Sequence, residues 1–208
     1  MAVALLADDG ATLASRVVYE QRRHAEQLAP MIAEVLVATG TDRTALTAIV
    51  VGTGPAPFTG LRVGLVTART LGMALGIPVY GVCGLDAVAA QAAADLDLVA
   101  GTEVLVVTDA RRREVYWGRY RVTTHAGTCI EPVAGPGVAS AAQVAADGRA
   151  DGAVVVGRGA GLYPGALPPV AGAPVDPALG QSDMVRVRWR GSALLRCGTR
   201  HLTTVNHR

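Results

Sequence analysis

The sequence contains no lysine, because all 19 of its basic residues are arginines. This absence excludes the enzyme classes that depend on a P-loop lysine, a protein-kinase lysine or a lysine Schiff base. Large rings are scarce too, with a single phenylalanine and an aromatic content of 4%. The 25 glycines instead predict close packing of the backbone. The three cysteines lie outside any CxxC pair, which suits a cytoplasmic protein.

Long apolar runs are also missing. No uninterrupted stretch approaches the ~20 residues that cross a bilayer, and the N-terminal residues read as a strand, so we expect neither a membrane span nor a secretory signal. The composition is 50% hydrophobic and 17% charged, which is typical of a soluble globular chain.

The formal net charge of +2 is unevenly distributed. Residues 1–182 hold 13 arginines and 16 acidic residues, a net charge of −3, whereas residues 183–208 hold 6 arginines and 1 aspartate, a net charge of +5. A nucleic-acid groove needs clustered positive charge along one face. We therefore expect any RNA contact to be peripheral or shared with a partner.

The periods of the apolar residues predict two α/β lobes. The first is expected to contain a hairpin over 2–19, helices over 23–39, 60–75 and 85–95, and strands over 46–52 and 78–82. The second is expected to contain strands over 103–108, 115–122 and 153–157, a Gly/Pro-rich loop before residue 141, and a helix over 141–146. We expect no regular element over 161–177, which is dense in proline and glycine, or over 183–208, which is aperiodic.

The densest motif is GTGPAPFTGLRVG at residues 52–64. A glycine-rich turn between a strand and a helix can present backbone amides to a phosphate. Two specific phosphate motifs fail, because GxGxxG needs glycine where Pro57 stands and Walker A needs a lysine. A structural turn and a phosphate-binding loop both remain open.

Small residues recur at every fourth position of the helix that follows, at Gly60, Gly64, Ala68, Gly72 and Gly76. Positions i and i+4 share one face, so another element can approach closely along this strip. Glycine inside a helix costs about 1 kcal/mol relative to alanine, which indicates that the close approach matters. The element on the strip is either part of this chain or a helix of a partner.

Catalytic and metal motifs are missing as well. His24 and Glu26 lack the spacing of HExxH, His125 and Cys129 have no third ligand nearby, and no GxSxG occurs. We expect no catalytic, metal-binding or cofactor-binding residue. The three arginines at 111–113 are interpreted as a solvated turn, with an RNA contact as the alternative.

Three blocks of the sequence resemble the TsaB family, also called YeaZ: RRHAEQLAPMI, GTGPAPFTGLRVGLVTARTLGMALGIPVYGV and TDARRREVYWGRY. They cover most of residues 20–120, and FTGLR is quite specific. The resemblance implies a degenerate, two-lobed ASKHA fold, the fold of the actin and Hsp70-like ATPases. Its first lobe would span residues 1–98, its second lobe 99–182, and an atypical arginine-rich tail 183–208.

The resemblance also implies a function. It identifies a non-catalytic cytoplasmic scaffold subunit, without a cofactor, that forms a heterodimer with a TsaD-like paralogue. The complex makes N6-threonylcarbamoyladenosine (t6A) at position 37 of tRNAs that read ANN codons. A TsaE-like ATPase would dock on the pair, tRNA would be bound only through the complex, and no membrane would be involved. The implied interface residues are His24, Leu28, Met31, Ile32, Gly60, Leu61, Gly64, Leu65, Ala68 and Gly72.

The sequence departs from the family at three places. The family has one more strand at its start, Ala56 and Pro57 replace a Gly-Ser pair, and the family ends in a helical segment where 183–208 is arginine-rich. Proline stiffens the turn, which weakens the case for nucleotide binding. We interpret the tail as read from a different frame, which the nucleotide sequence would test.

The alternative function is a stand-alone ATP-binding enzyme of the ASKHA type, similar to a sugar kinase. A third function, that of a peptidase, is disfavoured by the lack of metal-ligand spacing.

Overall fold

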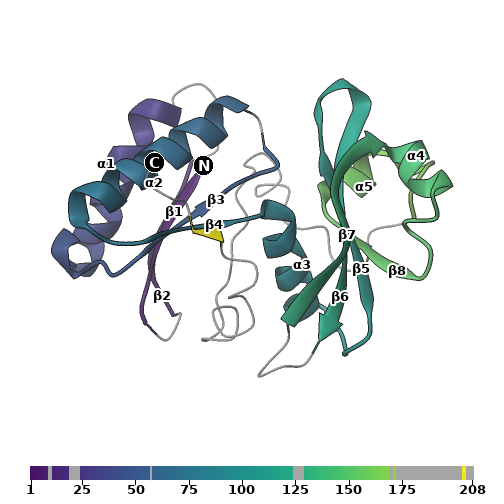
Figure 1. Ribbon diagram of the computed structural model, residues 1–208, viewed down its shortest axis with the longest axis horizontal. Helices are drawn as coiled ribbons and strands as arrows, with labels where there is room; N and C mark the ends of the chain where they lie inside the picture. Colours follow the sequence, from purple (N-terminus) through teal and green to yellow (C-terminus); the bar gives the residue numbers. More distant parts are fainter. Residues whose placement is uncertain are drawn as a thin grey trace. The chain divides into compact units, whose positions relative to one another are not determined.

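The computed structural model describes residues 1–8, 11–18, 24–56, 58–123, 129–168, 171 and 203–204. The chain forms two compact units, Met1–Gly84 with Gln181–Arg208, and Leu85–Gly180 (Figure 1). The lobe boundary expected at residue 98 stays a prediction, and these units divide the chain after Gly84. The prediction of no regular element over 183–208 is wrong at residues 203–204, which form a short strand. The other predictions for this tail lie outside the described residues.

The first unit begins with an antiparallel hairpin and a helix. Strands β1 (Ala2–Leu6) and β2 (Thr12–Val17) pair with Ala2 opposite Val17, and helix α1 (His24–Thr39) packs against both strands. Helix α1 buries an apolar face because its apolar residues recur at helical spacing. It ends at Gly40, whose φ of +64° lies in the left-handed region that glycine adopts easily.

A strand-helix-strand segment completes the described part of the first unit. Strands β3 (Ile49–Gly52) and β4 (Val79–Val82) are parallel, helix α2 (Phe58–Leu75) connects them, and β9 (Thr203–Thr204) pairs with the other edge of β4. Strand β3 begins later than the predicted residue 46. The preceding residues form a 3₁₀ turn, η1 (Arg43–Ala45), which starts where Oδ1 of Asp42 accepts a 2.7 Å hydrogen bond from the amide of Thr44.

The second unit is built on a four-stranded sheet with the order β7-β6-β5-β8. Strand β8 is parallel to β5, and the other pairs are antiparallel. The elements of this unit are α3 (Gly84–Asp95, whose first residue belongs to the first unit), β5 (Glu103–Asp109), the 3₁₀ turn η2 (Arg111–Arg113), β6 (Glu114–Thr123), β7 (Cys129–Ser140), α4 (Ala141–Ala146), β8 (Ala153–Val156) and α5 (Arg158–Leu162).

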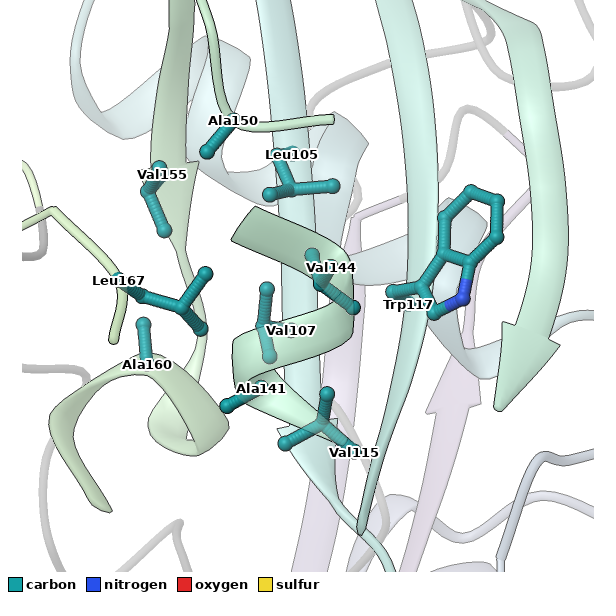
Figure 2. Close-up of a cluster of buried hydrophobic side chains, with 10 residues drawn as sticks. All are labelled: Leu105, Val107, Val115, Trp117, Ala141, Val144, Ala150, Val155, Ala160 and Leu167. Atoms are coloured by element: carbon teal, nitrogen blue, oxygen red, sulfur yellow. The ribbon is translucent and has the colours of Figure 1, made fainter. Parts of the chain in front are cut away.

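A core of buried apolar side chains holds this sheet to α4 and α5 (Figure 2). Val107, Val115 and Val144 are fully buried at its centre, and Trp117 is 7% exposed. The remaining members of this core are Leu105, Ala141, Ala150, Val155, Ala160 and Leu167. Most of these side chains are small, in agreement with the scarcity of aromatic residues.

Two sequence predictions for this unit are wrong. The Gly/Pro-rich loop expected before residue 141 contains the 12-residue strand β7. Proline is tolerated there because β7 lies at the edge of the sheet, where one side of the strand needs no ladder hydrogen bond. Glycine is needed at Gly137, where a Cβ atom would lie 2.7 Å from Cε2 of Trp117. Helix α5 also extends into the segment from residue 161 where no element was expected.

The predicted α/β class is confirmed, since each unit contains both helices and a β-sheet. Within the described part of the chain, every helix is too short or too polar to span a membrane.

Candidate functional site

The interface residues implied by the family resemblance lie on α1 and α2, and several of them are buried inside the first unit. Leu28 is 8% exposed, Met31 is 3% exposed and Ala68 is 6% exposed. Gly72 is buried too. These four residues therefore stabilise the chain's own core.

The other implied interface residues are less buried. Partial exposure is shared by Ile32, Gly60, Leu61, Gly64 and Leu65. His24 is the first residue of α1, and its side chain lies outside the described part of the structure. The interface as a whole stays a prediction.

Two glycines of the small-residue strip on α2, Gly64 and Gly72, face the chain's own sheet. A Cβ atom on Gly72 would collide with Cγ2 of Val79 and lie 3.1 Å from the carbonyl oxygen of Ile77, and one on Gly64 would lie 3.7 Å from Cγ2 of Val51. Of the two interpretations left open by the sequence, packing within the chain accounts for these two glycines.

Exposed apolar side chains mark a different face of the same two helices. Val66 of α2 is 63% exposed and Met73 is 70% exposed, and Val37 of α1 is 81% exposed. Val66 and Met73 are seven residues apart and so share one face of α2. Sequence reasoning missed this face. The available signal was the i, i+7 spacing of two apolar residues that alternate with Arg62 and Arg69, both exposed.

The glycine-rich loop between β3 and α2 is tied to its own surroundings. The amide of Thr53 donates a 2.8 Å hydrogen bond to the carbonyl of Val82, and the amide of Gly84 donates a 2.7 Å hydrogen bond to the carbonyl of Gly54. Pro55 has no amide hydrogen to offer, and Pro57 lies outside the described residues. These contacts occupy the Thr53 amide and the Gly54 carbonyl within the first unit, and both interpretations of the loop stay open.

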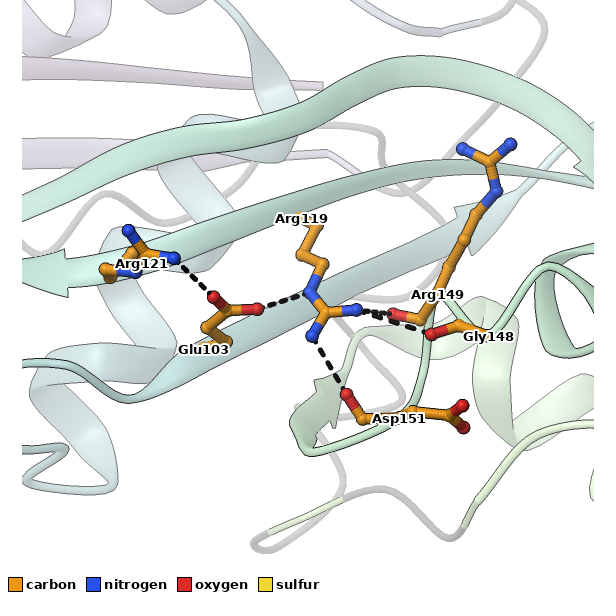
Figure 3. Close-up of polar contacts among 6 residues, drawn as sticks. All are labelled: Glu103, Arg119, Arg121, Gly148, Arg149 and Asp151. Carbon is orange, nitrogen blue, oxygen red and sulfur yellow. Dashed lines mark hydrogen bonds and ion pairs between the residues drawn. The ribbon is translucent and has the colours of Figure 1, made fainter.

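A polar cluster lies on the sheet of the second unit (Figure 3). Glu103 of β5 accepts hydrogen bonds from Nη2 of Arg121 at 2.7 Å and from Nε of Arg119 at 2.5 Å. Hydrogen bonds from the two guanidinium groups lower the pKa of the Glu103 carboxyl below its ordinary value of 4.5, and the bond from Arg121 has the larger effect. Both pairs are partly open to water, so their net contribution is modest.

Arg119 also holds the loop between α4 and β8. Its terminal nitrogens donate to the carbonyl oxygens of Gly148 at 3.4 Å, Arg149 at 3.1 Å and Asp151 at 2.9 Å (Figure 3). The guanidinium of Arg149 in turn lies 3.8 Å from the ring centroid of Trp117, a cation-π contact. The cluster therefore positions a loop of the second unit.

Metal ligands do not converge in the parts of the chain that the structure describes: no group of three or more His, Cys, Asp and Glu side chains there could hold a metal ion. The three consecutive arginines form the exposed turn η2 between β5 and β6, as the sequence predicted.

Comparison with known proteins shows to which family the chain belongs. A family model described as "TsaD: tRNA N6-adenosine threonylcarbamoyltransferase" matches residues 13–165. An uncharacterised protein of Mycobacterium tuberculosis is 51% identical over 112 residues, which cover 54% of this chain and 49% of that protein. The Escherichia coli "tRNA threonylcarbamoyladenosine biosynthesis protein TsaB" is 36% identical over 100 residues, which cover 48% of this chain and 42% of that protein.

Solved structures agree with the sequence relatives. YeaZ from Pseudomonas aeruginosa matches with a TM-score of 0.65 and 33% identity, over 84% of this chain and 76% of that one. The chain spans about half the length of the curated relatives it matches. The ASKHA-like α/β fold implied by the sequence blocks is confirmed. The chain belongs to the matched family, as a member of its TsaB/YeaZ branch.

Proposed function

We propose that this chain is a non-catalytic scaffold subunit of the complex that forms t6A at position 37 of tRNAs that read ANN codons. The observation that carries the proposal is the family match over residues 13–165, together with a 36% identical relative named for tRNA threonylcarbamoyladenosine biosynthesis. The lack of lysine and of nucleophile motifs in the sequence supports a subunit that acts through assembly.

The proposed partner is a TsaD-like paralogue, and the proposed contact surface is the exposed face of α1 and α2. Val66 and Met73 on α2 expose most of their apolar surface to water. Apolar side chains gain free energy when a partner covers them, and exposed apolar patches mark contact surfaces. A TsaE-like ATPase would join the pair, tRNA would be bound through the assembled complex, and the complex would work in the cytoplasm.

Co-elution of the full chain with a TsaD-like protein tests this surface. Val66→Glu and Met73→Glu place a charge on the proposed face, and we expect each to abolish or strongly weaken co-elution. Both side chains are exposed, so thermal unfolding should change little. The matched control is Val99→Glu in the second unit, because Val99 is 73% exposed and the charge change is the same.

Each result of this experiment has a clear meaning. Loss of co-elution in the α2 variants with retention in the control supports the surface. Normal co-elution of both α2 variants would show that α2 is not the contact face. Failure of the unaltered chain to associate with any TsaD-like protein, together with tight binding of Mg-ATP in calorimetric titration, would instead favour a stand-alone ATP-binding enzyme.

A further inference from the structure

The turn η2 between β5 and β6 keeps arginine where the backbone favours glycine. Arg112 has φ 65° and ψ 29°, and Arg113 has φ 62°. Both lie in the left-handed region, which side chains other than glycine, asparagine and aspartate seldom occupy. Two successive arginines in this conformation carry a backbone cost. Glycine at these two positions would relieve the strain.

The guanidinium groups of this turn are available for binding. Arg111, Arg112 and Arg113 are all exposed, and within the described ranges none of their side chains takes part in a hydrogen bond or an ion pair. The turn is flanked by Asp109 and Glu114, which leave the three arginines in excess.

Other arginines of the same unit behave differently. Arg119 and Arg121 are paired with Glu103, and Arg149 is paired with Asp147 at 2.7 Å. The unpaired state of the three η2 arginines is therefore a property of the turn and is not shared by the arginines of this unit in general.

Strand β5 and helix α5 pack together next to this turn. Strands β5 and β8 are parallel, so their carboxyl ends lie at the same edge of the sheet. The start of α5 packs on β5 there, because a Cβ atom on Gly159 would lie 2.8 Å from the carbonyl carbon of Thr108. The exposed Arg158 begins α5 at this edge. Tyr116, three residues after Arg113, is partly exposed.

We propose that the turn Arg111–Arg113 binds the phosphate backbone of an RNA. Guanidinium groups pair with phosphate oxygens in bidentate fashion, and phosphate contacts provide the electrostatic part of RNA affinity. Exposed side chains on a surface turn suit an extended polyanion, whereas a small anion is usually held in a recess lined by backbone amides. The choice of tRNA as the RNA rests on the proposed function.

The backbone conformation supplies a variant that separates binding from stability. In Arg112→Gly/Arg113→Gly, two charges are removed and the left-handed residues become glycines, so the thermal midpoint should stay equal or rise. The matched control is Arg16→Gln/Arg43→Gln, which removes two exposed charges from the first unit. Arg43 is exposed, and Arg16 is 47% exposed in a 3.3 Å pair with Glu34, so their loss should barely change stability.

The measurement is fluorescence anisotropy with a labelled tRNA transcript and the full chain, alone and with its TsaD-like partner. We expect the glycine variant to bind roughly tenfold more weakly at low salt and to lower the slope of log affinity against log salt by about 1 to 2. The control should keep the affinity and the slope of the unaltered chain.

Several outcomes would overturn the proposal. These are unchanged binding by the glycine variant, an equal loss in the control, a loss seen with ATP or inorganic polyphosphate but not with tRNA, and no tRNA binding by the unaltered chain in either form. Co-elution with the TsaD-like protein, measured on the same variants, separates this proposal from the scaffold function. Weakened RNA binding with normal co-elution supports RNA binding by the turn. Unchanged RNA binding with normal co-elution refutes RNA binding by the turn and leaves the scaffold function unaffected.

Discussion

The hydroxyl group of Tyr120 on β6 donates a 2.7 Å hydrogen bond to Oδ1 of Asp86 in the first turn of α3. Tyr120 is 1% exposed, so this bond forms at the end of a buried ring. The ring also passes over Gly118, where a Cβ atom would lie 2.7 Å from the hydroxyl oxygen. Within the second unit, this pair ties α3 to the sheet.

Tyr120→Phe tests this tie. The substitution keeps the ring and removes a hydrogen bond to a carboxylate, so we expect the free energy of unfolding to fall by about 1–2 kcal/mol. Urea denaturation of the full chain measures it. Tyr163→Phe is the control, because within the described residues no side-chain hydrogen bond is found for Tyr163, and it should change stability by less than ~0.5 kcal/mol. Equal losses in both variants would argue against a specific role of the Tyr120 bond.

Two glycines of α2 should respond in opposite directions to alanine. Gly72→Ala places a methyl group against Val79, and such overpacking should cost about 1–3 kcal/mol. Gly64→Ala meets Val51 at an ordinary 3.7 Å and should stabilise the helix by up to ~1 kcal/mol. Thermal unfolding of the two variants provides the comparison. A stabilising Gly72→Ala would contradict the close approach of α2 to β4.

The ion pairs of Glu103 predict a dependence of stability on pH. The pKa of Glu103 in the folded protein is lowered from 4.5 by Arg121 and Arg119. The pairs therefore stabilise the fold above about pH 4.5, and this contribution is lost as the pH falls through the lowered pKa. Glu103→Gln should reduce the thermal midpoint at neutral pH and flatten its decline in acid, in scans between about pH 7 and pH 3. Parallel declines for both proteins would show that Glu103 does not titrate as described.

Arg119→Lys tests the loop contact of the polar cluster. Lysine keeps the charge but lacks the planar fork that reaches Glu103 and the carbonyls of Arg149 and Asp151 together. We expect a loss of about 1–3 kcal/mol in urea denaturation. Arg121→Lys is the control, because its 52% exposed side chain makes one pair with Glu103 and should cost less than ~1 kcal/mol. Hydrogen exchange should rise in the loop between α4 and β8 of the Arg119 variant; unchanged exchange there would contradict the role of Arg119.

Much of the fold was predictable because most elements carry a local signal. Helix α1 shows its apolar face at Leu28, Met31 and Val35, and α4 lies at its predicted residues. Strand β7 was missed because its prolines and glycines have the composition of a loop. Its pairing with β6 makes this segment a strand, and a pairing between strands leaves no period in the sequence of β7 alone. It is an edge strand because β6 is its one neighbour in the described sheet.

The candidate sites divide in the same way. The family blocks pointed to α1 and α2, yet the sequence could not distinguish the side of α2 that Gly72 packs against β4 from the side that exposes Val66 and Met73. Small and apolar residues occur on both sides. Burial depends on which neighbouring element covers each face, and that is a property of the packed chain.

By itself, the sequence determined the α/β class, the order of most elements, the absence of lysine chemistry and the family. The tertiary structure decided which apolar residues stay exposed, which charges are paired, and that Arg112 and Arg113 hold left-handed conformations in an unpaired turn. The physical reason is that periodicity and motif spacing are local along the chain. Burial and ion pairs such as those of Glu103 with Arg119 and Arg121 depend on contacts between residues that are distant in sequence.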